Sequence, residues 1–278
     1  MRVLIGAKLV SFVRTSRESE RVLNMCLWAH GAKKGLEWSG QWAKFVFVKP
    51  IIIAVDGYSA TGKSTTAKRV ADILGYTFID TGAMYRAVTL YLLENGVDFH
   101  RESPELLQAL ECIHLKFVMN SNTGKRDIFL NDRNVEQAIR EMRVSAVVSE
   151  VSTLSSVRRR LVALQQQMGK EGGIVMDGRD IGTVVFPNAE LKVFLTAKMD
   201  TRVKRRLAEI AKSGGKTEEE SAVRQNLQHR DHIDSTRADS PLRKAQDAIE
   251  IDTSNLTIPE QTELVVTMAR QILERQSA

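Results

Sequence analysis

Cysteine is scarce in this sequence, with only Cys26 and Cys112 among 278 residues. Two cysteines so far apart exclude a disulfide framework and give no metal-ligand spacing, so we expect a reducing compartment, the cytoplasm. Long hydrophobic runs are absent as well: no stretch of about 18 apolar residues occurs, which excludes a membrane-spanning helix. The sequence also contains no low-complexity segment and no internal repeat. What remains is an ordinary globular composition, with 43% hydrophobic and 27% charged residues.

Acidic residues are scarce in one part of the chain, residues 1–49. Nine Lys and Arg occur there against three Asp and Glu, and this excess of six equals the net charge of +6 of the whole chain. The remaining residues are therefore formally neutral, and net charge gives no support for a nucleic-acid partner. The same segment holds all three tryptophans, Trp28, Trp38 and Trp42.

Residues 1–49 are therefore expected to form an atypical basic leader. Lys8 interrupts their apolar segment and no convincing small-residue cleavage site follows, which argues against a secretory signal peptide. An organelle transit peptide contains few acids, and Glu18 and Glu20 argue against that alternative. We expect the leader to be disordered or not part of the folded domain, as a start codon placed too early would produce, and the domain to span residues 50–278.

From Pro50 onwards, strand and helix patterns alternate. Residues 51–55 form a continuous apolar run, typical of a strand covered on both faces. Residues 63–74 form an amphipathic helix that ends at Gly75, and a second strand is expected at 76–79. Further core strands are expected at 174–176, 191–195 and 248–251. This order predicts an α/β fold of three layers around a parallel core sheet.

An insert at about residues 80–173 interrupts the parallel pattern. Alternating apolar residues at 113–117, a turn at 121–124 and a returning strand at 127–130 predict a small antiparallel sheet. Helices are expected at 84–93, 135–168, 200–212 and 217–230, and from the capping-box pair Thr257 and Glu260 onwards.

A complete phosphate-loop motif, G-x-x-x-x-G-K-[ST], follows the first strand. Its glycines let successive backbone N–H groups turn toward phosphate oxygens, and the next helix directs its N-terminus at the same anion. Lys63 is expected to contact the β- and γ-phosphates of ATP, and the Ser64 hydroxyl is expected to contact Mg²⁺. The residues expected to hold ATP are Gly57, Tyr58, Ser59, Ala60, Thr61, Gly62, Lys63, Ser64 and Thr65.

The phosphate loop alone does not choose between a kinase, a GTPase and an ATPase. A GTPase would need an N-K-x-D base-reading motif, which the sequence lacks. A motor or transporter ATPase would need an apolar run that ends in an acidic residue, and residues 174–177 match this only weakly. Asp177 could equally cap the turn that follows its strand.

Arginine is abundant in the second half of the chain. Phosphoryl transfer between two nucleotides requires neutralisation of dense negative charge, and the planar guanidinium bonds phosphate bidentately. For most of these arginines, a solvated basic helix face is the simpler interpretation. Composition therefore does not select the arginines that act in a reaction.

Four sequence blocks make that selection. DGYSATGKST at 56–65, DTGAMYR at 80–86, DGRDIGTVVFP at 177–187 and RDHIDSTRADSPL at 230–242 together resemble the bacterial-type cytidylate kinase family of P-loop nucleoside monophosphate kinases. The resemblance covers residues 51–278, and the last three blocks are far more specific than the first. It implies a P-loop kinase fold and ATP-dependent phosphorylation of CMP and dCMP with Mg²⁺, in pyrimidine metabolism. We expect a monomer whose partners are these nucleotides, without nucleic acid or membrane.

The resemblance also implies roles for individual residues. Arg86 is expected on the acceptor phosphate and Asp234 on the ribose, while Ser149 and Arg158 are expected to read the cytosine edge. The full acceptor set is Thr81, Arg86, Ser149, Arg158, Arg179, Asp180, Arg230, Asp234 and Arg237, and the expected catalytic residues are Lys63, Arg86, Arg179 and Arg237. Arg205 and Arg206 resemble the start of a lid, about residues 203–217, that closes over ATP.

Two positions depart from the family pattern. Tyr58 stands where many relatives have proline, and Thr81 where many have serine. Neither change removes a needed group, because position 58 contributes backbone and Thr81 keeps its hydroxyl.

Three alternatives stay open at the level of sequence. The acceptor could be UMP, AMP or a non-nucleotide, since the base-edge assignments decide this. The chain could instead be a regulatory or nucleic-acid-binding protein whose basic leader contacts an acidic partner. Ser149 could bond back to its own helix rather than face a ligand.

Overall fold

The computed structural model describes residues 2–5, 8–11, 49–212 and 219–277. Residues 1–48 form most of one unit of the chain, and residues 49–276 form most of another. In the first unit, β1 (Arg2–Ile5) pairs antiparallel with β2 (Lys8–Ser11). Residues 12–48 of the predicted leader lie outside the described residues, so the expectation for the leader stays a prediction.

A five-stranded parallel sheet forms the centre of the second unit, with the strand order β10–β9–β3–β8–β4. All five predicted core strands are present within two residues of their expected bounds, as β3 (Ile52–Gly57), β4 (Thr77–Asp80), β8 (Ile174–Gly178), β9 (Leu191–Thr196) and β10 (Ile249–Asp252). Because β3 is the middle strand, the loop after it leaves the centre of the carboxyl edge, where parallel α/β sheets bind ligands.

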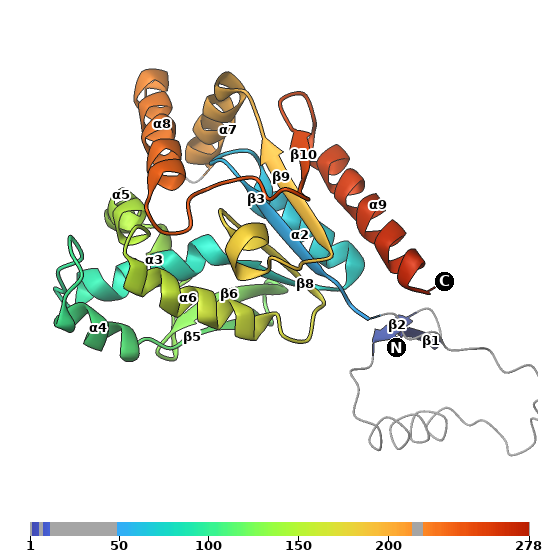
Figure 1. Ribbon diagram of the computed structural model, residues 1–278, viewed down its shortest axis with the longest axis horizontal. Coiled ribbons are helices and arrows are strands. Elements are labelled where there is room, and N and C mark those ends of the chain that lie inside the picture. The colour runs from blue at the N-terminus through green and yellow to red at the C-terminus, as the bar shows by residue number, and fades with distance from the viewer. Residues whose placement is uncertain (1, 6–7, 12–48, 213–218, 278) are drawn as a thin grey trace, which may run out of the picture. The chain divides into compact units, whose positions relative to one another are not determined.

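Helices cover both faces of this sheet (Figure 1). The side chains of β3 alternate between two apolar clusters. Ala54 packs on one face with α3 (Thr81–Glu94) and α6 (Ser155–Met168). Ile53 packs on the other face with α2 (Lys63–Leu74) and α9 (Ile258–Ser277). The predicted α/β fold of three layers is thereby confirmed.

The start and end of the first helix follow the sequence signals closely. α2 ends at Gly75, whose φ of +67° is the left-handed conformation that glycine adopts without strain. At the last helix, Thr257 and Glu260 form the predicted capping box, since the Thr257 N–H donates to Glu260 Oε2 at 2.7 Å.

The insert contains the predicted antiparallel sheet and one helix that was not predicted. The sheet has three strands, β5 (Leu115–Asn120), β6 (Lys125–Leu130) and β7 (Arg133–Asn134). A helix that the sequence reading missed, α4 (Pro104–Glu111), begins at Ser103, whose side chain accepts the Leu106 N–H.

The helical stretch predicted at 135–168 is divided into three elements, which corrects that prediction. They are η1 (Ala138–Arg140), α5 (Met142–Val151) and α6. Ser152 and Thr153 lie at the break after α5, and their hydroxyls donate to the Ser149 and Glu150 carbonyl oxygens, local bonds that are typical of turns.

Two helices, α7 (Met199–Lys212) and α8 (Glu220–Thr236), pack against each other through Val203, Val223 and Leu227. Residues 213–217 of the predicted lid lie outside the described residues. α8 extends six residues past its predicted end at 230. Asp234 therefore lies within the helix, and Arg237 is its C-cap residue.

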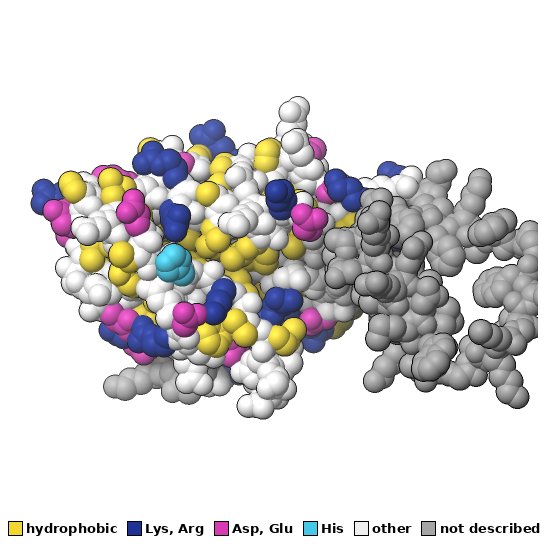
Figure 2. All heavy atoms as spheres, turned by 90° about the horizontal axis from the view of Figure 1, so that it is seen from below, with side chains coloured by type: hydrophobic (Ala, Val, Ile, Leu, Met, Phe, Trp, Pro, Cys, Tyr) yellow, Lys and Arg dark blue, Asp and Glu magenta, His cyan; other side chains and the backbone are white. Residues whose placement is uncertain are grey.

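The helices and the surface of the described residues bear on two kinds of partner, membranes and charged molecules. None of the helices in the described ranges is long and apolar enough to cross a membrane. Figure 2 shows one face of the molecule, on which Lys and Arg side chains are interspersed with Asp and Glu. This face therefore offers no patch of a single charge sign among its described residues.

Candidate active site

The phosphate loop, residues 57–65, joins β3 to α2. Its first residue must be glycine, because Gly57 has a φ of +140° and a Cβ there would lie 2.1 Å from the Leu195 carbonyl oxygen. Lys63 is 5% exposed, and its Nζ donates to the Tyr58 carbonyl oxygen. Burial, together with the nearby Arg179, lowers the pKa of Lys63 well below its usual value. An anion bound in the loop would favour the charged form of this lysine.

A cavity of about 1790 Å³ opens beside the loop. It reaches from α2 to the insert, so a single space contacts both halves of the predicted site. The structure brings most predicted residues to it: Ser59, Ala60, Gly62, Lys63, Ser64, Thr65, Thr81, Arg86, Ser149, Arg158, Arg179, Asp180, Arg206, Arg230, Asp234 and Arg237. The lining does not include Gly57, Tyr58, Thr61 or Arg205.

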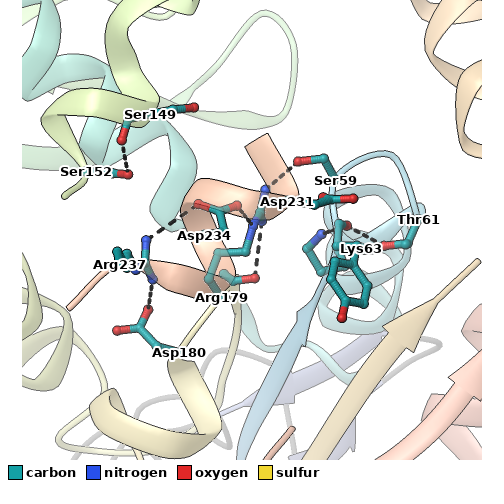
Figure 3. A network of polar contacts seen from close by, with 12 residues as sticks. Ser59, Thr61, Lys63, Ser149, Ser152, Arg179, Asp180, Asp231, Asp234 and Arg237 are labelled. Atoms are coloured by element: carbon teal, nitrogen blue, oxygen red, sulfur yellow. Dashed lines mark hydrogen bonds and ion pairs between the residues drawn. The ribbon is translucent and has the colours of Figure 1, made fainter. Parts of the chain in front are cut away.

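Arg179 lies at the centre of the polar contacts in the cavity (Figure 3). Its Nε donates to Asp234 Oδ2 at 2.7 Å, and its Nη2 donates to the Ser59 hydroxyl at 2.9 Å. Burial alone would raise the pKa of Asp234, but Arg179 and two further arginines hold it below its usual range. The arginine thus fixes an ionised carboxylate from α8 next to the phosphate loop.

Arg158 and Asp180 form a buried ion pair at the insert side. Arg158 is 1% exposed; it donates to an Asp180 carboxylate oxygen and, at 3.1 Å, to the Ser152 carbonyl oxygen. Its guanidinium also lies 5.6 Å from the centre of the Tyr85 ring. Arg237 approaches the same Asp180 at 3.8 Å. A buried pair with these partners fixes the wall of the cavity.

Arg86 and Arg230 form no ion pair with a carboxylate among the described residues. Arg86 donates to the Ser145 hydroxyl at 3.0 Å. In the described part of the chain, the Arg230 Nε is buried without a hydrogen-bond partner. Burial and the charges of Arg179 and Arg86 lower the pKa of Arg230 to about 10. Such crowded, incompletely paired cations are suited to a phosphate dianion.

Ser64 and Asp177 form a separate polar contact at the loop. The Ser64 hydroxyl donates to Asp177 Oδ2 at 2.5 Å, and the other oxygen, Oδ1, is buried without a partner within the described ranges. Burial and the nearby Asp80 raise the pKa of Asp177 to about 7. The Thr81 hydroxyl donates to the Asp177 carbonyl oxygen at 2.7 Å, so this hydroxyl is committed to the backbone.

Ser149 lies on α5 and lines the cavity. Its carbonyl oxygen accepts the Ser152 hydroxyl at 2.7 Å (Figure 3). None of the hydrogen bonds among the described residues uses the Ser149 hydroxyl, so the alternative that it bonds back to its helix gains no support.

Arg205 is directed away from the cavity. Its guanidinium donates to the carbonyl oxygens of Thr61, Thr253 and Leu256 at 3.2, 2.6 and 3.2 Å. These bonds join the phosphate loop to the segment before α9. Direct contact of Arg205 with ATP therefore stays a prediction without support from its position, whereas Arg206 lines the cavity.

Three residues that shape the site were not predicted from the sequence: Asp56, Arg202 and Asp231. Asp56 accepts the N–H groups of Ile181 and Gly182 at 2.9 and 2.7 Å, which fixes the turn after Asp180. Arg202 bonds the phosphate loop and Asp231. Asp56 lies directly before the first glycine of the phosphate-loop motif, and this position could have indicated its role. Asp231 lies in the fourth family block and Arg202 is one of the arginines of the second half of the chain, but the sequence assigned no role to either residue.

Comparison with known proteins shows the family of the chain. The family model described as Cytidylate kinase matches residues 53–271. The cytidylate kinase of Parabacteroides distasonis is 54% identical over 217 residues, which cover 77% of this chain and 94% of that protein. The cytidylate kinase of Flavobacterium psychrophilum is 51% identical over 229 residues, which cover 81% of this chain and all of that protein. The chain therefore belongs to the cytidylate kinase family.

Proposed function

We propose that this chain transfers the γ-phosphoryl group of ATP to CMP and dCMP, giving ADP and the cytidine diphosphates. The observation that carries the proposal is the continuous cavity that joins Lys63 of the phosphate loop to Arg86, Arg179 and Arg230. A donor nucleotide on the loop and an acceptor phosphate on these arginines would share one space. Membership of the cytidylate kinase family supports cytidine as the acceptor base.

The proposed mechanism relies on position and charge. An oxygen of the acceptor phosphate attacks the γ-phosphorus of ATP, the bond to the β-phosphate oxygen breaks, and ADP leaves. The acceptor phosphate is already anionic at neutral pH, so no general base is needed. Lys63, Arg179 and Arg86 stabilise the negative charge on the transferring group and its neighbours.

Recognition of the acceptor is proposed for the opposite wall of the cavity. Asp234, held ionised by Arg179, is suited to accept a hydrogen bond from a ribose hydroxyl. The Ser149 hydroxyl and the Arg158–Asp180 pair present polar atoms that suit the donor and acceptor edge of cytosine. Arg237, anchored by the Ser240 carbonyl oxygen at 2.7 Å, supports Asp180 and Asp234 and adds positive charge.

The residues at the loop fit Mg²⁺. The Ser64 hydroxyl lies next to the Asp177 carboxylate, one oxygen of which has no hydrogen-bond partner among the described residues. Hydroxyl and carboxylate oxygens are ligand types that Mg²⁺ prefers. Mg²⁺ in kinases is usually held by one or two such groups and by the phosphates of the nucleotide. Bound with ATP, the ion would neutralise phosphate charge.

We also propose the domain organisation and setting given by the sequence: an acceptor-binding insert near residues 80–173, a lid near 203–217, and a monomer in the cytoplasm that serves pyrimidine metabolism. Size-exclusion chromatography with light scattering tests the proposed monomer, and a dimer that binds CMP between its subunits would contradict that proposal.

An assay of ADP release tests the function. ATP and Mg²⁺ are incubated with CMP, dCMP, UMP, AMP, GMP or no acceptor. Strong release with CMP and dCMP, and little without acceptor, is the expected result. A preference for UMP or AMP would show that the acceptor base is not cytosine. ADP release at the same rate with and without an acceptor would show an ATPase.

A further inference from the structure

Two arginines of α7 contact the outer side of the phosphate loop. Arg202 Nη1 donates to the Ser59 carbonyl oxygen at 3.2 Å, and Arg205 Nη1 donates to the Thr61 carbonyl oxygen at 3.2 Å. A phosphate loop turns its peptide N–H groups toward the anion, so its carbonyl groups turn away. The arginines therefore bind the loop from behind, outside the space that a nucleotide would fill.

Arg202 also connects α7 to α8. It is 6% exposed, and the same Nη1 donates to Asp231 Oδ2 at 2.6 Å. Figure 3 shows Asp231 beside Ser59. Asp231 follows Arg230 directly and precedes Asp234 by one turn, and both of these residues line the cavity. One guanidinium thus joins the phosphate loop to the helix that carries two proposed acceptor residues.

Arg202 makes a third contact, with the aromatic ring of Tyr58. The guanidinium of Arg202 lies 5.4 Å from the centre of the Tyr58 ring. The edge of that ring packs on Phe194 of β9, with centroids 5.9 Å apart. A proline in place of Tyr58 could not make this cation–π contact.

We propose that Arg202, with Asp231 as its counter-ion, is a positioning residue that holds the phosphate loop in its ATP-binding shape and couples this shape to α8. The Ser59 carbonyl belongs to the same peptide unit as the Ala60 N–H. A cation on this carbonyl polarises the unit and strengthens the N–H as a donor toward phosphate. The inference rests on the proposed function, because it assigns ATP to the loop.

Binding of MgADP without any acceptor, measured by isothermal titration calorimetry, tests the role at the loop directly. Arg202→Ala is expected to weaken MgADP binding by roughly tenfold, the effect of losing one charge-assisted hydrogen bond. The KM for ATP is expected to rise by a similar factor, and the KM for CMP by less. Arg202→Lys should restore much of the affinity, because an ammonium group still donates to the Ser59 carbonyl.

Arg224→Ala is the matched control. Arg224 on α8 pairs with Asp200 on α7 at 2.8 Å, so it also links the two helices but makes no contact with the loop. Its loss should leave MgADP affinity unchanged. Thermal melts of each variant show whether the helices stay packed.

The outcomes separate the hypotheses. MgADP affinity within about twofold of wild type in a folded Arg202→Ala protein would overturn the positioning role, even if the melting temperature falls. If CMP proves not to be the acceptor but MgADP binding still weakens in Arg202→Ala, the positioning role stands and only the acceptor assignment fails. If Arg202→Ala does not fold, Asp231→Asn carries the test instead, because it removes the charge of the counter-ion, and unchanged MgADP affinity in that folded variant would refute the proposal.

Discussion

Arg179 donates to Asp234 with an Nε to Oδ2 distance of 2.7 Å, and these two residues are 55 positions apart in sequence. The bond joins the end of β8 to α8, and the second arm of the same guanidinium contacts Ser59 of the phosphate loop at 2.9 Å. A single cation is thereby fixed between the donor and acceptor parts of the cavity. In the proposed reaction, negative charge would develop between these two parts of the cavity.

Replacement of Arg179 by alanine is expected to lower kcat by roughly 10²–10³-fold, because a preorganised cation is lost from the transition state. The KM for CMP should also rise, since Asp234 loses its partner. Steady-state kinetics with both substrates varied measure the two effects. Arg243, an exposed arginine that does not line the cavity, provides the control, and its alanine variant should behave as wild type. A larger effect on the KM for ATP than on kcat would contradict this role.

Arg230→Ala is expected to separate stability from binding. The arginine is half-buried, and loss of water together with the neighbouring Arg179 and Arg86 lowers its pKa to about 10, so its removal should leave the ligand-free protein as stable or more stable. CMP affinity should fall by about 1.5–3 kcal/mol, the usual contribution of a hydrogen bond to a charged group. Differential scanning fluorimetry with and without CMP measures both quantities. A ligand-free variant that melts earlier but keeps the full CMP-induced shift would refute the assignment.

Asp56 is expected to make stability depend on pH in a defined window. Burial raises its pKa from 3.8 to about 6, although the N–H groups of Gly182 and Ile181 oppose this. Between these two values the folded protein holds a proton that the unfolded chain has lost. The free energy of unfolding should therefore fall as pH rises from about 4 to 6, by up to about 3 kcal/mol from this group.

Urea unfolding of wild type and Asp56→Asn across this pH range measures that contribution. The variant cannot titrate at position 56, so its stability should decline less with pH than that of wild type. Parallel curves for the two proteins would show that Asp56 does not titrate in the window.

Removal of Mg²⁺ by EDTA is expected to abolish turnover, and excess Mg²⁺ should restore it. Ser64→Ala should shift the dependence of kcat on free Mg²⁺ to higher concentration, because the hydroxyl next to Asp177 is lost. Ser64→Thr keeps the hydroxyl and should shift it less. Turnover that is indifferent to EDTA would remove Mg²⁺ from the proposed reaction.

Local patterns in the sequence were sufficient for the core of the fold. The apolar run of β3, the glycines of the phosphate loop and the capping residues of α2 and α9 act over a few positions, so their effect is readable without tertiary structure. The insert was less predictable. Its α5–α6 break falls at Ser152 and Thr153, whose hydroxyls bond to nearby backbone carbonyl oxygens, and polarity alone does not reveal such local bonds.

The sequence by itself determined the parallel α/β core, the phosphate loop and the four blocks that indicate the family. Only the tertiary structure decided what each arginine contacts. Arg205 and Arg206 are adjacent, yet one is bound to backbone carbonyl oxygens and the other lines the cavity. The sequence did not distinguish Arg202 from the other arginines of this half of the chain, yet it joins the loop to α8. The reason is physical: a guanidinium on a long side chain takes its role from the acceptors it reaches, and packing between distant segments sets those acceptors.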